Sequence, residues 1–290
     1  ASSLLGNNLL KSIESSKCYH TYLTHPTPGG IYFDCLKHKL SDIDCNLIEV
    51  ENAIILIGQT DPIKCFHNPE LSEELNCGSI IRILKELKEY SIKPIFTSTE
   101  YVFDGLTGNY GEDATANPTL LYGKQKLTVE NFIKENFDNF LILRLAKMFG
   151  DFSDPRDSIF TSWIKALVEQ TNITCANDQV FSPVQLSDVC EIINLGISFN
   201  LKGLFHLGGK ETWNRYDMLL KTRSILQEYF HSNSEILTQS INEFNLPETY
   251  PLNVSLNSSK IYRELNFEPQ QIEKYIKLIV KEYIKNIYAK

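Results

Sequence analysis

Short apolar runs alternate with amphipathic stretches along the first two thirds of the chain. Parallel strands are joined by helical crossovers, so this alternation predicts an α/β fold built on a parallel sheet. Apolar residues at helical spacing predict helices over residues 71–90 and 120–136. The predicted strands, each apolar and bounded by polar residues, glycine or proline, are residues 18–23, 30–33, 53–57, 94–97 and 140–145.

The pattern becomes more irregular in the last part of the chain, where helices are predicted over residues 213–230 and 270–288. We therefore expect a dinucleotide-binding domain over residues 1–150, with residues 180–205 as an optional addition. A smaller α/β substrate lobe is expected over residues 151–290.

Two features of the predicted sheet stay open. One pair of strands, near residues 172–175 and 203–207, either returns to the first sheet or builds a second one. The chain also begins at Ala1 in a turn that leads into a helix, without an apolar strand before it. Because a missing strand would expose the edge of a central strand, we expect further residues upstream of Ala1 in the complete protein. A natural fold without this strand is the alternative.

The composition is that of a globular protein, with 42% hydrophobic and 22% charged residues. No apolar run approaches the roughly 20 residues that span a bilayer. A formal net charge of -8 without a basic stripe argues against a nucleic-acid partner. The 7 cysteines lie at wide spacings without a CxxC pair, which predicts reduced thiols rather than disulfides or a metal site. We expect a cytoplasmic protein that binds neither membranes nor nucleic acids.

Candidate chemistry lies between residues 98 and 126. Tyr122 and Lys126 share one face of a predicted helix, where an ammonium favours the ionised form of a phenol and the pair can exchange protons. Ser98 and Thr99 end a predicted strand, where open parallel sheets bind ligands and a hydroxyl can stabilise a developing oxyanion. The alternatives are a chance pair on a solvated helix and a hydroxyl that caps a turn.

The segment STEYVFDGLTGNYGEDATANPTLLYGKQK (residues 98–126) resembles the signature of the dTDP-4-dehydrorhamnose reductases, which are extended short-chain dehydrogenases/reductases that handle nucleotide sugars. Similar segments continue the resemblance through the chain: NPELSEELNCGSI, NDQVFSPVQLSDV and GLFHLGGKETWNRYDM. The resemblance implies a Rossmann-type doubly wound parallel sheet that binds NAD(P), with a smaller C-terminal α/β substrate lobe.

The resemblance also implies a role for each candidate residue. Thr99 would polarise a ketone, Tyr122 would donate a proton, and Lys126 would lower the pKa of Tyr122 and hold the nicotinamide ribose. Asn76 would hold a proton relay behind Lys126, with an ordinary polar helix residue as the alternative. The residues that would contact substrate are Ser98, Thr99, Glu100, Tyr101 and Lys147.

The first turn of the chain is a candidate pyrophosphate site, because a helix N-terminus presents N–H groups and a positive dipole end. Ser2, Ser3 and Leu4 form this turn, and Gly6 is the one glycine of the family's G-x-x-G-x-x-G pattern that remains. Ser3 stands at the second glycine position, where its side chain would crowd the pyrophosphate or donate to it. The other residues implied to bind the cofactor are His25, Asp34, Ile57, Gly58, Gln59, Asn76, Tyr122 and Lys126.

The end of the second predicted strand bears on the choice of cofactor. Members of the family that prefer NAD carry a carboxylate there for the ribose 2'-hydroxyl, but this chain has Thr24 and His25. NADP is therefore favoured and NAD is the alternative. Asp34 resembles the family's adenine-side aspartate, and its alternative role is to cap a turn.

Two positions on the substrate side depart from the family pattern. Lys147 stands where the relatives carry an aromatic residue, and Tyr250 stands where they usually carry an arginine before proline. An arginine can bind a diphosphate through two hydrogen bonds, which tyrosine cannot do. Cations that could replace it, each of which is also an ordinary surface charge, are Arg156, Lys165, Lys210 and Arg215.

The favoured function is an NAD(P)H-dependent reductase of a nucleotide-linked 4-keto-6-deoxy sugar that supplies surface polysaccharide. An epimerase or dehydratase would use the same tyrosine and lysine together with a further acid or base, for which Glu100 is the candidate. A non-catalytic NADP-binding regulatory subunit, like the methionine adenosyltransferase beta subunit that resembles the same reductases, is the third reading. The expected partners are a nucleotide sugar and, as in many family members, a second copy of the chain.

Overall fold

The computed structural model describes residues 3–13, 18–150 and 159–288. Its helices are α1 (Leu4–Ser12), α2 (Pro62–His67), α3 (Pro69–Glu73), α4 (Ser79–Glu89), α5 (Leu121–Asn136), α6 (Ile159–Val168), α7 (Leu186–Ser198), α8 (Arg215–Leu226), α9 (Ser259–Glu264) and α10 (Ile272–Tyr288). Its strands are β1 (Thr21–Tyr22), β2 (Ile31–Tyr32), β3 (Asn52–Ile55), β4 (Lys93–Thr99), β5 (Leu141–Leu145), β6 (Met148–Phe149), β7 (Ile173–Ala176), β8 (Val180–Phe181), β9 (Val184–Gln185), β10 (Gly203–Leu207), β11 (Trp213–Asn214) and β12 (Ile236–Gln239).

A parallel sheet with the strand order β10-β5-β4-β3 forms the centre of the molecule, and β1 and β2 form a separate parallel pair. Thr99 at the end of β4 lies opposite Leu145 at the end of β5, so the carboxyl ends of neighbouring strands meet at one edge. The parallel sheet and its helical crossovers confirm the predicted α/β fold.

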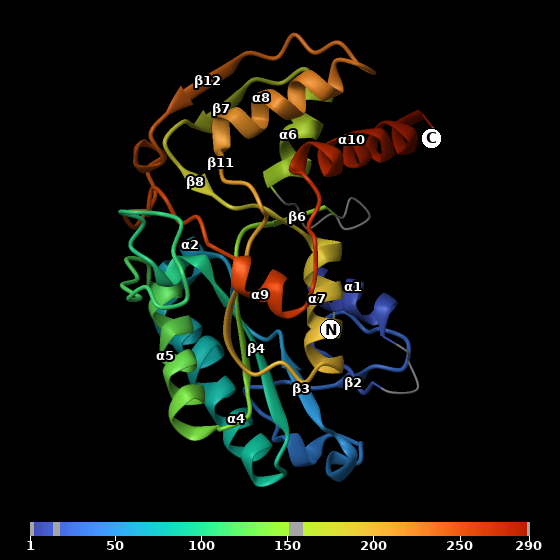
Figure 1. Ribbon diagram of the computed structural model, residues 1–290, viewed down its shortest axis with the longest axis vertical. Coiled ribbons are helices and arrows are strands. Elements are labelled where there is room, and N and C mark those ends of the chain that lie inside the picture. The colour runs from blue at the N-terminus through green and yellow to red at the C-terminus, as the bar shows by residue number, and fades with distance from the viewer. Residues whose placement is uncertain (1–2, 14–17, 151–158, 289–290) are drawn as a thin grey trace.

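Side chains alternate between the two faces of this sheet, as the twofold repeat of a strand requires. Ile95 and Leu143 pack in a hydrophobic cluster with residues of α1 and α7. Phe96 and Ile142, one position away, pack in another cluster with residues of α4 and α5. Figure 1 shows α4 and α5 on one side of the sheet and α1 and α7 on the other. Both faces are therefore covered, which explains the nearly continuous apolar runs of β4 and β5.

A third large hydrophobic cluster lies in what we call the C-terminal lobe, formed by α6, α8, α10, β7 and β12 (Figure 1). Here β7 pairs with β12 in parallel, while β10 joins the central sheet beside β5. The two strands predicted as a pair thus belong to different sheets. β10 returns to the central sheet, and β7 builds a second sheet. No helix in the described ranges is both long and apolar enough to cross a membrane.

The loop after β4 connects the sheet to the C-terminal lobe. The backbone N–H of Asn253 donates to the carbonyl of Gly105 at 3.0 Å, and Tyr110 forms a bridge with Leu256. Gly105 has a φ of 75°, and a Cβ atom there would lie 2.4 Å from the Pro251 side chain. Glycine is therefore required for this close approach, which places the end of β4 beside the lobe.

Candidate active site

Thr99, Tyr122 and Lys126 lie together at the carboxyl edge of the sheet. Thr99 ends β4 and is buried, and its Oγ1 accepts a hydrogen bond from the N–H of Tyr101 at 3.3 Å. Tyr122 and Lys126 are both buried on α5, and the Thr99 hydroxyl is close enough to Tyr122 to affect its pKa. Lys126 Nζ lies 5.8 Å from the centre of the Tyr122 ring and donates to the Thr97 carbonyl at 2.9 Å.

A glycine explains how α5 comes so close to the end of β4. Gly123 follows Tyr122 in the helix, and a Cβ atom at this position would lie 2.0 Å from the carbonyl oxygen of Tyr101. Any other residue would push the helix away from the turn that follows Thr99. The glycine in the YGKQK segment therefore has a packing role that positions Tyr122 against Thr99.

The pKa of Tyr122 is raised, whereas the family resemblance implied that Lys126 would lower it. Burial raises the pKa of Tyr122, and the nearby Thr99 hydroxyl offsets only part of this effect. Burial also lowers the pKa of Lys126 to about 8, against the opposing effects of Cys77 and Glu130. A phenol with a raised pKa holds its proton at neutral pH, so Tyr122 is suited to be a proton donor.

Asn76 holds the loop that follows β3. It lies in a π-helical turn (Glu74–Gly78), a feature that often occurs at functional sites. Its Oδ1 accepts from the N–H of Gln59 at 2.8 Å, while Nδ2 donates to the Gln59 carbonyl at 3.0 Å and to Gln125 Oε1 at 2.7 Å. Gly58 adopts a φ of 142°, and a Cβ atom there would lie 2.6 Å from Asn76 Oδ1. The two bonds to Gln59 fix the backbone of residues 57–59, three of the predicted cofactor positions.

The other predicted cofactor residues lie near the amino-terminal elements. Ser3 is the N-cap of α1, and its Oγ accepts from the N–H of Gly6 at 3.1 Å, while Leu4 begins the helix. The predicted Ser2 lies outside the described residues. His25 is exposed after β1, where its Nδ1 lies 2.8 Å from Thr24 Oγ1.

Asp34 follows β2 and is bound to its own turn. Its Oδ1 accepts from the N–H of Leu36 at 3.1 Å, and its Oδ2 lies 3.1 Å from Lys37 Nζ. The backbone bond and the bond to Lys37 hold the pKa of Asp34 below its ordinary value. The Asp34 carboxylate therefore caps its own turn, which is the alternative role considered for it. A contact with adenine stays a prediction.

The predicted substrate residues divide into two groups. Ser98 points to the core, where its Oγ donates to Glu130 Oε1 at 2.5 Å. Glu100 and Tyr101 lie in the turn after Thr99, and Tyr101 meets Tyr250 of the C-terminal lobe edge to face at a centroid distance of 6.0 Å. Lys147 follows β5 and keeps contact with solvent.

Glu100 has an unusual environment for a carboxyl group. Burial raises its pKa to about 8, although the charge and backbone of Lys147 and the charge of Arg215 oppose this shift. Its Oε2 is buried without a hydrogen-bond partner among the described residues. A carboxyl group of this kind is largely protonated at neutral pH, so it can donate one hydrogen bond and accept others.

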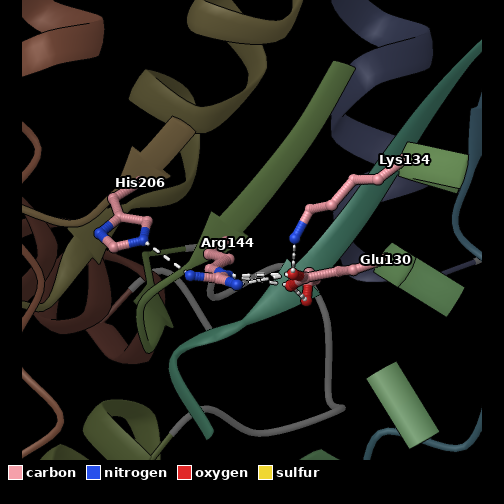
Figure 2. Close-up of polar contacts among 5 residues, drawn as sticks. Glu130, Lys134, Arg144 and His206 are labelled. Carbon is pink, nitrogen blue, oxygen red and sulfur yellow. Dashed lines mark hydrogen bonds and ion pairs between the residues drawn. The ribbon is translucent and has the colours of Figure 1, made fainter. Parts of the chain in front are cut away.

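A buried ion pair holds α5 against β5. It was not predicted from the sequence. Figure 2 shows Arg144 of β5 between Glu130 of α5 and His206 of β10. The guanidinium donates to both Glu130 oxygens, at 2.7 Å from Nη2 and 2.9 Å from Nε, and its Nη1 lies 3.3 Å from His206 Nε2. Lys134 approaches the same carboxylate from outside at 3.3 Å. An arginine within the apolar run LILRL was the available signal, because a buried charge needs a partner.

Burial and the charge of Arg144 lower the pKa of His206 to about 4. The neutral imidazole then accepts from Arg144 through Nε2 and donates from Nδ1 to the carbonyl of Tyr110 at 2.9 Å. The pair and its neighbours thereby join α5, β4, β5 and β10, the elements that carry or support the tyrosine and lysine.

The four cations considered as replacements for the family arginine lie in different places. Lys210 pairs with Glu268, and Lys165 pairs with Glu169 at 4.0 Å on an exposed helix face. Arg156 lies outside the described residues. Arg215 begins α8 and is close enough to Glu100, Tyr101 and Tyr250 for its charge to affect each of them. Of these cations, Arg215 is the one placed next to the candidate site in the described part of the chain.

Comparison with known proteins agrees with this geometry. The family described as RmlD substrate binding domain matches residues 1–285. The chain belongs to this family. The resemblance to dTDP-4-dehydrorhamnose reductases that the sequence motifs indicated is thereby confirmed, because a match over this range includes both the sheet and the C-terminal lobe.

Relatives of this RmlD-family chain have different roles. The probable low-salt glycan biosynthesis reductase Agl14 of Haloferax volcanii is 25% identical over 94% of this chain and 93% of its own length. Methionine adenosyltransferase 2 subunit beta of Mus musculus is 27% identical over 75% of this chain and 68% of its own length. The crystal structure of dTDP-4-dehydrorhamnose reductase from Bacillus anthracis in complex with NADP has a TM-score of 0.78 and 20% identity, covering 96% of this chain and 95% of that chain. The sequence relatives of this chain thus include a probable reductase and a subunit of another enzyme.

Proposed function

We propose that this chain is an NAD(P)H-dependent reductase of a nucleotide-linked 4-keto-6-deoxy sugar. The observation that carries this proposal is the grouping of Thr99, Tyr122 and Lys126 at the carboxyl edge of the sheet, where the Thr99 hydroxyl is close enough to Tyr122 to affect its pKa. Open parallel sheets bind ligands at this edge. Membership of the RmlD family and the Haloferax glycan-biosynthesis reductase support a role in making precursors of surface polysaccharide, which we place in the cytoplasm.

The hydroxyl groups of Thr99 and Tyr122 are placed to bind the same carbonyl oxygen. A bound NAD(P)H supplies a hydride to the carbonyl carbon. Tyr122 gives its proton to the oxygen, so the carbonyl becomes an alcohol and the phenol becomes a phenolate. Lys126 is largely protonated at neutral pH, because its pKa is about 8, and its charge stabilises the phenolate until a proton returns.

The residues present fit a nicotinamide cofactor. An ammonium has three donors, and Lys126 uses one of them for Thr97 among the described residues, which leaves donors for ribose hydroxyls. The loop that Asn76 fixes at Gln59 approaches the same region, since Asn76 also binds Gln125 of α5. We assign the cofactor to residues 1–150, with the C-terminal lobe contacting substrate. NADP is favoured over NAD because Thr24 and His25 offer no carboxylate to repel a 2'-phosphate.

The test is oxidation of NADPH and of NADH by the purified protein with dTDP-4-keto-6-deoxy-L-mannose and with its UDP-linked and GDP-linked analogues. We expect turnover with one of these substrates, and we expect Tyr122→Phe to lower kcat about 100-fold or more because the proton donor is lost. Tyr229→Phe changes an exposed tyrosine of the C-terminal lobe and should leave kcat unchanged. Equal rates for the wild type and Tyr122→Phe would overturn the assignment.

A second candidate is a regulatory subunit that binds NADP without turning over a substrate. The similarity to methionine adenosyltransferase 2 subunit beta favours it. Binding of NADPH without oxidation of any tested sugar, together with co-purification of a stoichiometric partner enzyme, would support this candidate. A third candidate, epimerase or dehydratase chemistry, would use Glu100 as an added acid or base and would leave NAD(P)H concentrations unchanged over many turnovers.

A further inference from the structure

Gln125 lies between the two candidate catalytic residues of α5. It comes three residues after Tyr122 and directly before Lys126, and its side chain is buried. Lys126 donates to the Thr97 carbonyl of β4. Consecutive helix residues point in different directions, so Gln125 instead reaches Asn76 in the π-helical turn that follows α3. One turn of α5 is thus bonded to two separate segments of the chain.

Both ends of the Gln125 amide are bonded. Its Oε1 accepts from Asn76 Nδ2 at 2.7 Å, and its Nε2 donates to Ser72 Oγ at 2.9 Å. The Ser72 hydroxyl in turn reaches the carbonyls of Cys65 and Pro69, at 3.2 and 3.0 Å. A shift of the amide would leave buried polar atoms without partners, so Gln125 and Asn76 hold each other in one position.

Asn76 extends this constraint to the backbone of the loop after β3 (residues 57–59). Its Oδ1 accepts from the N–H of Gln59, and its Nδ2 donates to the Gln59 carbonyl. The chain of contacts therefore runs from α5 through two buried amides to a loop beyond the carboxyl end of β3. Open parallel sheets bind ligands at this edge, where Thr99 and Tyr122 also lie.

Packing alone does not require an amide at position 125. The helices α4 and α5 already pack through apolar side chains, among them Ile80, Leu84, Val129 and Ile133. Buried polar partners that are replaced together by apolar groups can leave stability nearly unchanged. A satisfied polar network instead fixes a single arrangement of the elements that share it. Hydride transfer needs such an arrangement, because the reacting atoms have to lie about 3–3.5 Å apart.

We propose that Gln125 is a positioning residue: through Asn76 it sets the distance between the loop after β3 and the face of α5 that carries Tyr122. The inference rests on the proposed function, in which this loop contacts the nicotinamide cofactor and Tyr122 binds the ketone. A displacement of about 1 Å can slow a reaction about 100-fold. Gln125 therefore acts on the rate of hydride transfer more than on the affinity for the sugar.

The experiment compares the whole chain with its variant Gln125→Met, which keeps the size of the side chain and removes both hydrogen bonds. With the sugar nucleotide that the wild type reduces, kcat should fall about 10- to 100-fold while KM for the sugar changes less than about 3-fold. Single-turnover oxidation of bound NADPH should slow to the same extent, because it measures hydride transfer without product release.

Two measurements without sugar test the same link independently of turnover. Amide hydrogen exchange in the peptide that contains Gln59 should become about 10-fold faster in Gln125→Met, because Asn76 loses the partner that holds it. The affinity for NADPH should weaken about 3- to 10-fold for the same reason. A wild type that reduces none of the sugars would contradict the proposed function, whereas exchange at Gln59 and NADPH affinity would still test the role of Gln125.

Thr222→Val is the control for a loss of stability alone. Thr222 is buried in α8, and its Oγ1 donates to the Met218 carbonyl at 2.8 Å. This variant should lower the thermal midpoint and leave kcat and exchange at Gln59 unchanged. If Gln125→Met were unstable, Gln125→Ser carries the same expectations, because its side chain is too short to reach Asn76 and leaves room for water beside the freed groups.

The proposal is overturned if a folded Gln125 variant keeps the wild-type kcat, or if exchange at Gln59 is the same in both proteins. It is also overturned if kcat and KM change together, since that result would show a general disturbance of the site rather than a displaced hydride donor.

Discussion

Two buried glutamates near β4 differ in how completely they are bonded. Both oxygens of Glu130 receive hydrogen bonds from Arg144, and Ser98 adds another, so the pKa of Glu130 lies below its ordinary value although burial alone would raise it. Glu100 follows Thr99 directly; burial raises its pKa to about 8, and its Oε2 has no partner in the described part of the chain. Ser98 of β4 thus belongs to a complete network, whereas Glu100, in the turn that follows the strand, belongs to an incomplete one.

The difference separates scaffold from site. A complete buried network fixes the elements that contribute to it, and Glu130 and Arg144 fix α5 against β5, as Figure 2 shows. An incomplete network retains hydrogen-bonding capacity that a ligand can use. We therefore expect substitutions in the first network to change mainly stability, and substitutions at Glu100 to change mainly binding and the dependence of stability on pH.

The largest expected effect is that of Arg144→Met. It leaves the fully buried Glu130 carboxylate without its main partner, which should lower the free energy of unfolding by about 3–5 kcal/mol. Urea denaturation at neutral pH measures the change. The double variant Glu130→Met with Arg144→Met removes both charges and should recover part of the loss. If the single variant lost less than about 1 kcal/mol, the pair would not be the scaffold that we describe.

Glu100→Gln tests the other glutamate through pH. The wild-type side chain has a pKa of about 8 in the folded chain and an ordinary value near 4.5 in the unfolded chain. The folded chain thus binds the proton more tightly, so this contribution is fully present below the lower value and is lost as pH rises toward the higher one. The free energy of unfolding of the wild type should fall relative to that of Glu100→Gln, by up to about 4 kcal/mol between about pH 5 and about pH 8.

Urea denaturation of both proteins across this pH range gives the comparison, and the other titrating groups cancel because they are present in both. Parallel pH profiles would mean that Glu100 is ionised at its ordinary pKa and is not the protonated carboxyl group described above. A difference that grows with pH would support the contrast with Glu130, whose pKa is shifted the opposite way.

The sequence predicted the central elements well because their signals are local. The run 94–97 lies within β4, and the helix predicted over 120–136 is α5 within one residue of its start. Strand pairing was harder to predict. β7 pairs with β12, whose residues are mostly half-buried or exposed, so no apolar alternation marked it in the loop-rich passage between α8 and α10.

The site was predictable only as far as spacing determines it. The spacing of Tyr122 and Lys126 predicted that they share a helix face. That they lie close to Thr99 was predicted from the family resemblance. The direction of the Tyr122 pKa depends on burial, which the sequence does not state. The partners of Asn76 lie 17 and 49 residues away in the chain, and Gln125 was not among the predicted residues although it lies within the YGKQK segment. Contacts of this range are set by packing of whole elements rather than by local pattern.

The smallest expected effect belongs to Lys134→Met. Lys134 approaches Glu130 at 3.3 Å, but its side chain is 36% exposed, whereas that of Arg144 is 3% exposed. Water already screens its charge and Arg144 already satisfies the carboxylate, so the free energy of unfolding should fall by less than about 1 kcal/mol. Lys277→Met is the matched control, because it breaks an exposed pair of the same helical spacing with Glu273. Similar small losses that shrink with added salt are expected for both variants, whereas a loss comparable to that of Arg144→Met would show that the scaffold network extends to the surface.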